Sequence, residues 1–197
     1  MKPLVLLALL FSTPALAAEA PLSGALVCAV RGALGTPWSH DTCAQVAGSL
    51  NATGRPRTLL AIGIIESRLR PHAVSRLIRL PDGRTAKDAG LLGTRCILAG
   101  KKCANLEIDG HPIPLKDLYR PEVNIAIANR IVEEKVKACG TRWPDCYNGN
   151  PSGSNKYGEQ IAVLTASFTG VQSKGGSARV RAIAARILRF VFGIRIS

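Results

Sequence analysis

The sequence has few acidic residues, few aromatic residues and no hydrophobic run long enough to span a membrane. Its 197 residues include 13 Asp and Glu against 26 Lys and Arg, which gives a formal net charge of +13. The uninterrupted apolar run Leu4–Phe11 is far shorter than the ~20 residues of a membrane-spanning helix. No compositional period or sustained heptad occurs, which excludes collagen and coiled coils. The basic excess predicts an anionic partner: nucleic acid, acidic lipid or an anionic cell-wall polymer.

Residues that commonly bind metals or act as nucleophiles are also sparse. The three histidines, His40, His72 and His111, are isolated, and no C-x-x-C occurs. A zinc site is therefore not expected, and no cofactor is predicted. The G-x-S-x-G pattern of nucleophilic hydrolases is missing as well. A secreted nuclease would fit the charge, but the clustered His and Asp that hold its metal are not there.

The N-terminus resembles an export signal. Lys2 precedes the apolar run, and an A-x-A tripeptide ends at Ala17, the order typical of a secretory signal peptide over residues 1–17. The alternative is a buried N-terminal helix. Cleavage after Ala17 removes only Lys2 among the charged residues, so the exported protein stays strongly basic. A periplasmic or extracellular location makes nucleic acid the least expected anion and favours envelope polymers or a membrane surface.

Six cysteines agree with export, because an exported chain can oxidise an even set of cysteines. Six cysteines allow 15 pairings, and the sequence alone cannot select one. We favour three local bridges because each closes a short loop: Cys28–Cys43, Cys96–Cys103 and Cys139–Cys146.

The remaining chain predicts one mainly helical domain with small β-hairpins and no dividing linker. Residues 18–56 form a loosely helical lead-in, and residues 57–197 form the main domain. Helices are predicted at about 57–69, 121–138, 158–168 and 177–192, and hairpins at 75–87 and 106–115. The last helix is basic and amphipathic, so it either docks on the core or binds an anionic membrane.

The sharpest chemical signal is Glu66, the only acidic residue in its predicted helix. Its helical neighbours carry apolar side chains or none: Leu59, Ile62, Gly63 and Leu69. The carboxyl group therefore faces the core or a cleft, where loss of hydration raises its pKa, as a general acid requires. Gly63 would let a ligand approach the helix. The alternative is a surface ion pair with Arg70, four residues on.

Four segments of the chain match motifs of one known family. Residues 64–75, IIESRLRPHAVS, and residues 88–93, DAGLLG, resemble the catalytic E-S segment and the G-L-M-Q segment of the soluble lytic transglycosylases and goose-type lysozymes. Residues 119–125, YRPEVNI, resemble its P-x-x-N-I helix start, and residues 147–149, YNG, its Y-N-x-G loop. Four motifs in the family's order are far more specific than any one of them, and the resemblance implies an α+β lysozyme-like fold.

The resemblance also implies roles for individual residues. Glu66 is expected to be the sole catalytic carboxylate, first an acid and then a base, with Ser67 and Tyr147 orienting it or the sugar. Residues expected to line a glycan cleft are Asp88, Gly90, Leu91, Leu92 and Asn148. The implied partner is a peptidoglycan glycan strand, and the implied reaction cleaves the MurNAc–GlcNAc bond and leaves a 1,6-anhydromuramoyl end.

Two departures from the family keep alternatives open. Gly93 stands where the family has Gln, and residues 76–87 form an insertion that is either a wall of the cleft or an inert surface loop. A lysozyme-like hydrolase would need a second carboxylate to position water, and Asp88 is the best candidate. A basic wall- or membrane-binding protein on an inactive scaffold is the third possibility. The oligomeric state is open.

Overall fold

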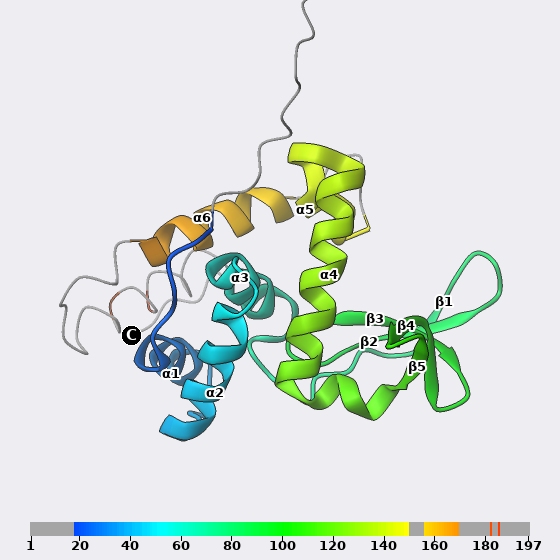
Figure 1. The fold of residues 1–197 in the computed structure, drawn as a ribbon, viewed down its shortest axis with the longest axis horizontal. Helices are drawn as coiled ribbons and strands as arrows, with labels where there is room; N and C mark the ends of the chain where they lie inside the picture. Colours follow the sequence, from blue (N-terminus) through cyan, green and yellow to red (C-terminus); the bar gives the residue numbers. More distant parts are fainter. Residues whose placement is uncertain (1–17, 150–155, 170–181, 183–184, 186–197) are drawn as a thin grey trace, which may run out of the picture.

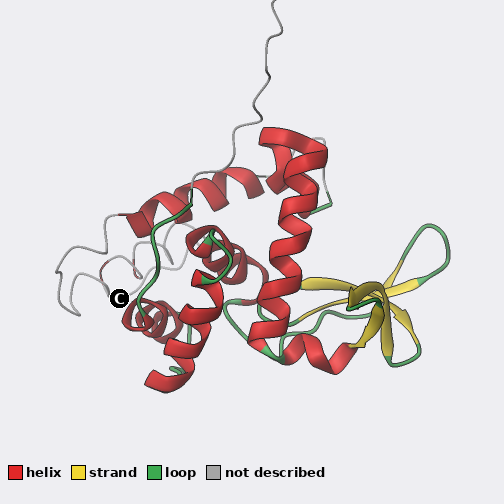
Figure 2. Cartoon of the chain, in the orientation of Figure 1, coloured by secondary structure: helices red, strands yellow, loops and turns green. Residues whose placement is uncertain are grey.

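A computed structural model describes residues 18–149, 156–169, 182 and 185 of the chain. The predicted signal peptide lies outside the described residues, and so does the predicted helix at 177–192 apart from positions 182 and 185. The described part is mainly helical, with one small antiparallel sheet on one side of the helices (Figure 2). This confirms the fold class expected from the sequence. Within the described residues, no helix is both long and apolar enough to cross a membrane.

The lead-in contains two regular helices, α1 (Gly24–Ala33) and α2 (His40–Asn51). Each begins after a serine whose hydroxyl accepts a backbone N–H, Ser23 from Leu26 and Ser39 from Thr42, the usual chemistry of a helix N-cap. The two helices lie side by side (Figure 1), and their apolar side chains join the same core as the helix that carries Glu66.

That helix, α3 (Pro56–Ser67), lies at the centre of the helical part (Figure 1). Pro56 occupies its first turn, where the missing N–H is not needed. The Glu19 carboxylate accepts the backbone N–H groups of Arg57 and Thr58 at 2.6 and 3.0 Å, so a distant residue caps this helix. The helix ends two residues earlier than predicted, because Arg68 adopts the left-handed conformation with φ 55°.

The sheet has five antiparallel strands in sequence order. They are β1 (Ile78–Arg79), β2 (Thr85–Ala89), β3 (Thr94–Ala99), β4 (Lys102–Ile108) and β5 (His111–Pro114). Both predicted hairpins are confirmed, β1–β2 and β4–β5. The inserted residues 76–87 make the β1–β2 hairpin, whose loop projects from the body at the end of the sheet farthest from α1 and α2 (Figure 1).

The long helix α4 (Pro121–Cys139) follows the short 3-10 turn η1 (Leu115–Tyr119) and separates the sheet from α1 and α2 (Figure 1). After α4 the chain forms the 3-10 turn η2 (Gly140–Arg142) and the short helix α5 (Trp143–Tyr147), where no helix was predicted. Helix α6 (Tyr157–Thr169) then packs on α3. All three predicted disulfides are present: Cys28–Cys43, Cys96–Cys103 and Cys139–Cys146.

Candidate functional site

A cleft of about 360 Å³ lies between α4, the β2–β4 part of the sheet and the end of α5. Glu66, from the last turn of α3, lines it, and so do the predicted residues Asp88, Tyr147 and Asn148. These four residues are up to 82 positions apart in the sequence, and the fold brings them to one surface. In the described part of the chain, no group of three or more His, Cys, Asp or Glu side chains is placed to hold a metal ion.

The Glu66 side chain reaches solvent in this cleft but is closely flanked by protein. Its Oε1 accepts a hydrogen bond of 2.7 Å from the hydroxyl of Tyr157, at the start of α6. Loss of hydration raises the pKa of Glu66, and the nearby negative charge of Asp88 acts in the same direction. The hydrogen bond from Tyr157 and the positive charge of Arg95 oppose this rise. The direction of the pKa shift expected from the sequence is therefore confirmed.

The alternative partner of Glu66, Arg70, lies beyond the end of α3. Its Nε donates to the carbonyl oxygen of Ser67 at 2.9 Å. Because the chain turns into the left-handed conformation at Arg68 and Leu69, the i,i+4 geometry needed for an ion pair with Glu66 does not arise. Gly63, in turn, is buried, and a Cβ there would lie 2.8 Å from Leu69 and 3.3 Å from the Leu91 carbonyl oxygen. Its small size serves packing in the core rather than ligand approach.

Gly93 is packed directly against the carboxylate. Its φ is +61°, a conformation that favours glycine. A Cβ at this position would lie 2.9 Å from Glu66 Cβ and 3.0 Å from Glu66 Oε2. A side chain at residue 93 would therefore displace Glu66 unless the turn changed shape, which gives a structural reason for the glycine that departs from the family motif.

The turn that carries Gly93 is held from behind by two buried polar residues. Ser67 Oγ donates to the carbonyl oxygen of Leu91 at 2.6 Å. Asn124, fully buried in α4, accepts the backbone N–H of Leu92 at 2.7 Å and donates to the carbonyl oxygen of Ala89 at 3.1 Å and to the Thr94 hydroxyl at 3.1 Å. These bonds link α3, α4 and the turn into one rigid support.

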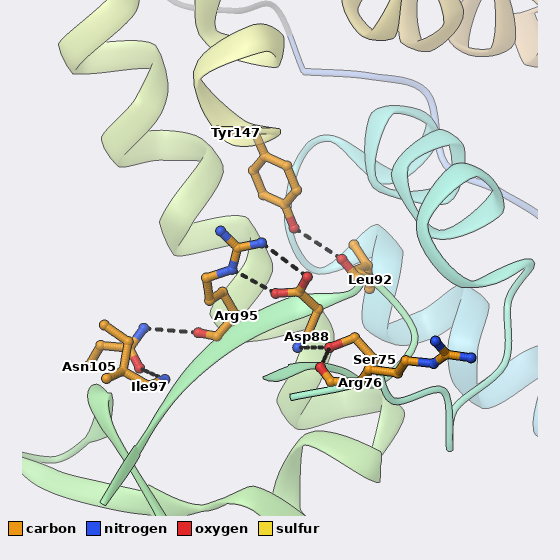
Figure 3. A network of polar contacts seen from close by, with 8 residues as sticks. All are labelled: Ser75, Arg76, Asp88, Leu92, Arg95, Ile97, Asn105 and Tyr147. Carbon is orange, nitrogen blue, oxygen red and sulfur yellow. Dashed lines mark hydrogen bonds and ion pairs between the residues drawn. The ribbon is translucent and has the colours of Figure 1, made fainter. Parts of the chain in front are cut away.

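The residues expected to line the cleft therefore fall into two groups. Ser67, Gly90, Leu91 and Leu92 are buried beneath it, the two leucine side chains within the helical core. Glu66, Asp88, Tyr147 and Asn148 line it directly. The Tyr147 hydroxyl donates to the carbonyl oxygen of Leu92 at 3.2 Å (Figure 3), so Tyr147 ties α5 to the turn.

Asp88 and Arg95 form a two-pronged ion pair across β2 and β3 (Figure 3). The Nε and Nη2 atoms of Arg95 donate to the two carboxylate oxygens of Asp88 at 2.8 and 3.0 Å. The backbone N–H of Asp88 donates to the Ser75 hydroxyl at 2.9 Å, which fixes the strand end. Both carboxylate oxygens of Asp88, the predicted second carboxylate of the site, thus accept hydrogen bonds from the Arg95 cation.

A comparison with models of known protein families gives a match to the transglycosylase SLT domain over residues 46–163, more than half of the chain. The chain belongs to the transglycosylase SLT domain family. It has no significant match among curated proteins or among solved structures.

The SLT domain match begins within α2 and ends within α6, so it includes the whole cleft and Tyr157. At the level of the family, it implies lytic-transglycosylase-type cleavage of peptidoglycan, a substrate found outside the cytoplasm. The family suspected from the four sequence motifs is therefore confirmed.

Sequence reasoning missed three residues of this SLT domain site: Tyr157, Arg95 and Asn124. Tyr157 is 91 positions from Glu66 and begins a predicted helix with no local signal of its partner. Asn124 belongs to the P-x-x-N-I motif, which indicated the family but did not indicate what the Asn124 side chain does. Arg95 was one of many arginines, and only its placement beside Asp88 distinguishes it.

Proposed function

We propose that this protein is an exported peptidoglycan lytic transglycosylase that uses Glu66 as its single acid and base. It cleaves the MurNAc–GlcNAc glycosidic bond and leaves 1,6-anhydromuramoyl ends. The observation that carries the proposal is the position of Glu66: a carboxyl group with a raised pKa, in a cleft, held by one hydrogen bond from Tyr157. A carboxylic acid that keeps its proton near neutral pH is what the first step requires.

In the first step Glu66 gives its proton to the glycosidic oxygen, and the bond from that oxygen to C1 of the muramoyl residue breaks. Since Oε1 accepts from the Tyr157 hydroxyl, the proton to be transferred belongs on Oε2. That oxygen lies on the side of Gly93, where no side chain intrudes. The hydrogen bond from Tyr157 then stabilises the carboxylate that remains.

In the second step the Glu66 carboxylate takes the proton of the muramoyl 6-hydroxyl group, and the oxygen of that hydroxyl forms a bond to C1 of the same sugar. The charge on the sugar is neutralised, the anhydro ring closes and Glu66 is returned to its protonated form. The hydrogen bond from Tyr147 to the Leu92 carbonyl oxygen holds Tyr147 in the cleft. There Tyr147 and Asn148 would contact the sugar.

The ion pair between Asp88 and Arg95 supports transglycosylation over hydrolysis. An inverting hydrolase needs a second carboxylate free to take a proton from water. Both oxygens of Asp88 accept bonds from Arg95, so the carboxylate is already engaged and is not free to position a water molecule. Glu134, which also lines the cleft, lies 3.9 Å from the Arg130 guanidinium.

The test is digestion of purified sacculi followed by mass analysis of the released fragments. We expect anhydromuropeptides from the wild type and a loss of at least a hundredfold in rate for Glu66→Gln. The matched control is Glu107→Gln, which removes the same charge from an exposed position of β4. Reducing-end fragments would mean hydrolysis, and no fragments from folded wild type would favour a wall-binding protein without catalysis.

Export is part of the same proposal and has its own test. Expression with the complete N-terminus, followed by N-terminal sequencing of the protein recovered outside the cytoplasm, should show a chain that begins after Ala17 or Ala20. Retention of Met1 in that protein would contradict the proposed signal peptide.

A further inference from the structure

A second hollow, of about 240 Å³, lies where the end of α1 meets the segment that follows α3. Its described lining consists of Arg31, Leu34, Gly35, Thr36, Arg68 and Arg70. Three of these six residues are arginines and none is acidic. We call this hollow the arginine pocket.

Arg31 is the most unusual residue of the arginine pocket because it is almost fully buried. It lies in the last turn of α1 with only 8% of its surface exposed. Its guanidinium lies 5.6 Å from the ring of Trp38, a distance at which the aromatic face attracts a cation. Its Nε, however, has no hydrogen-bond partner in the described part of the chain.

A second arginine, Arg70, lies close enough to act on this buried cation, and the described lining of the pocket contains no carboxylate. Burial lowers the pKa of Arg31, and the positive charge of Arg70 lowers it further. Two like charges in a partly desolvated hollow repel each other, and a buried charge is normally paired. Elsewhere in the described chain, arginines at the cleft and on the surface do find carboxylates, such as Arg95 with Asp88 and Arg84 with Asp82.

A backbone turn directly after α3 places Arg68 and Arg70 at the arginine pocket. Arg68 and Leu69 both have positive φ, 55° and 54°, and this turn brings residues 68 and 70 to the same hollow. Arg70 is fixed twice, by its backbone N–H to the Ser67 hydroxyl at 3.0 Å and by its Nε to the Ser67 carbonyl oxygen at 2.9 Å. The bond at Nε restricts the side chain of Arg70 before any ligand binds, which reduces the entropy lost on binding.

We propose that the arginine pocket binds a phosphate group through Arg31, Arg68 and Arg70. The terminal oxygens of a phosphate, three in a monoester and two in a diester, point to the corners of a tetrahedron, so guanidinium groups can approach them from several directions. The two oxygens of a carboxylate lie in one plane with its carbon and suit such an arrangement less well. The arginine pocket and the proposed glycan cleft have no described lining residue in common. The phosphate would therefore be a second ligand, separate from the glycan. The inference does not depend on the proposed catalytic function.

The first test is thermal unfolding of the purified, disulfide-bonded protein in inorganic phosphate at constant ionic strength. We expect a saturable rise in Tm with phosphate that sodium chloride does not reproduce, and we expect sodium acetate to give a much smaller rise. Equal stabilisation by acetate and phosphate would overturn the assignment to phosphate. No saturable rise with phosphate would overturn the site itself.

The second test uses variants that separate binding from folding. Arg31→Met keeps an unbranched side chain that reaches about as far as the arginine Nε and removes the unpaired buried donor, so without phosphate it should be at least as stable as the wild type. It should bind phosphate at least tenfold more weakly, and Arg70→Met should do the same. The control is Arg76→Gln, which removes the same charge from an exposed side chain outside the pocket. Phosphate binding unchanged in both methionine variants would refute the proposal.

The source of the phosphate is distinguished by a further titration with poly(glycerol phosphate). Binding that is tighter per phosphate than for inorganic phosphate, and lost in Arg31→Met, indicates an envelope polymer as the natural ligand. Equal binding per phosphate indicates a site for the free ion. Polymer binding that survives in Arg31→Met would show that the general basic charge, and not the arginine pocket, is responsible.

Discussion

Asn124→Ala tests whether the buried amide of α4 supports the turn that carries Gly93 and contacts Glu66. Asn124 is fully buried and makes three hydrogen bonds to residues 89–94. Alanine removes all three bonds. The backbone N–H of Leu92, which donates to Asn124 Oδ1 at 2.7 Å in the wild type, then loses this acceptor. The turn that carries Gly93 would then lose its link to α4 and, with it, the fixed contact with Glu66.

The expected loss of stability follows from these groups. A buried N–H left without a partner costs about 1–3 kcal/mol, and the shortened side chain leaves a small void that adds to the loss. The better helix propensity of alanine returns about 0.5 kcal/mol. We expect a net loss of about 2–4 kcal/mol, and each kcal/mol lowers Tm by roughly 2–4 °C in a domain of this size.

The assay is chemical denaturation together with the rate of release from sacculi, at a temperature where both proteins are folded. The control is Asn129→Ala in the same helix. Among the described residues its amide Nδ2 donates to Glu133 at 3.0 Å, and its Oδ1 is buried with no hydrogen-bond partner. That control should change stability by less than about 0.5 kcal/mol. Equal losses in the two variants, or full activity in folded Asn124→Ala, would refute the reasoning.

Three further predictions concern the carboxylate itself. Gly93→Ala should reduce activity more than tenfold in a soluble protein, because its Cβ would meet Glu66 and φ is +61°; unchanged turnover would contradict this. At acidic pH Glu66→Gln should be as stable as the wild type. As pH rises through the raised pKa of Glu66 the variant should become the more stable protein, since only the wild type must then ionise a carboxyl group that has lost part of its hydration. Curves of stability against pH that stay parallel would contradict this. Tyr157→Phe should raise the pKa of Glu66, so the alkaline limb of the pH–rate profile should move to higher pH while the maximal rate falls; an unmoved limb would show that the hydroxyl does not act on Glu66.

The sequence predicted the helices and hairpins best where local signals were strong. Pro121 and Gly140 mark the ends of α4, and the two Asp-Gly turns lie in the two predicted hairpins. Strand β3 was missed, because residues 90–100 show no clear alternation and its strand character comes from pairing with β2 and β4. Helix α5 was missed because it has only five residues and is bordered by a disulfide.

For the candidate site, the sequence identified the residue types and the fold decided the contacts. Ser67 and Leu91 were expected near the sugar, yet they lie buried behind the turn and hold it to α3. Gly93 was only a departure from the family motif in the sequence, and the structure gives it a steric role beside Glu66. Such differences of a few ångströms depend on packing between distant segments, which no local pattern records.

Local patterns alone thus predicted the mainly helical class and Glu66 as the one acidic residue on an apolar helix, since each depends on spacing within a short stretch. They favoured the three short-loop disulfides, but only the folded structure selected that pairing among the fifteen. Only the tertiary structure decided that Tyr157 bonds to Glu66, that Arg95 engages Asp88, and that Arg31 is buried near Arg70 with no acid among the described residues of the pocket lining. Hydrogen bonds and charge interactions act over a few ångströms of space. Which partners come that close is therefore set by the packing of whole helices and strands.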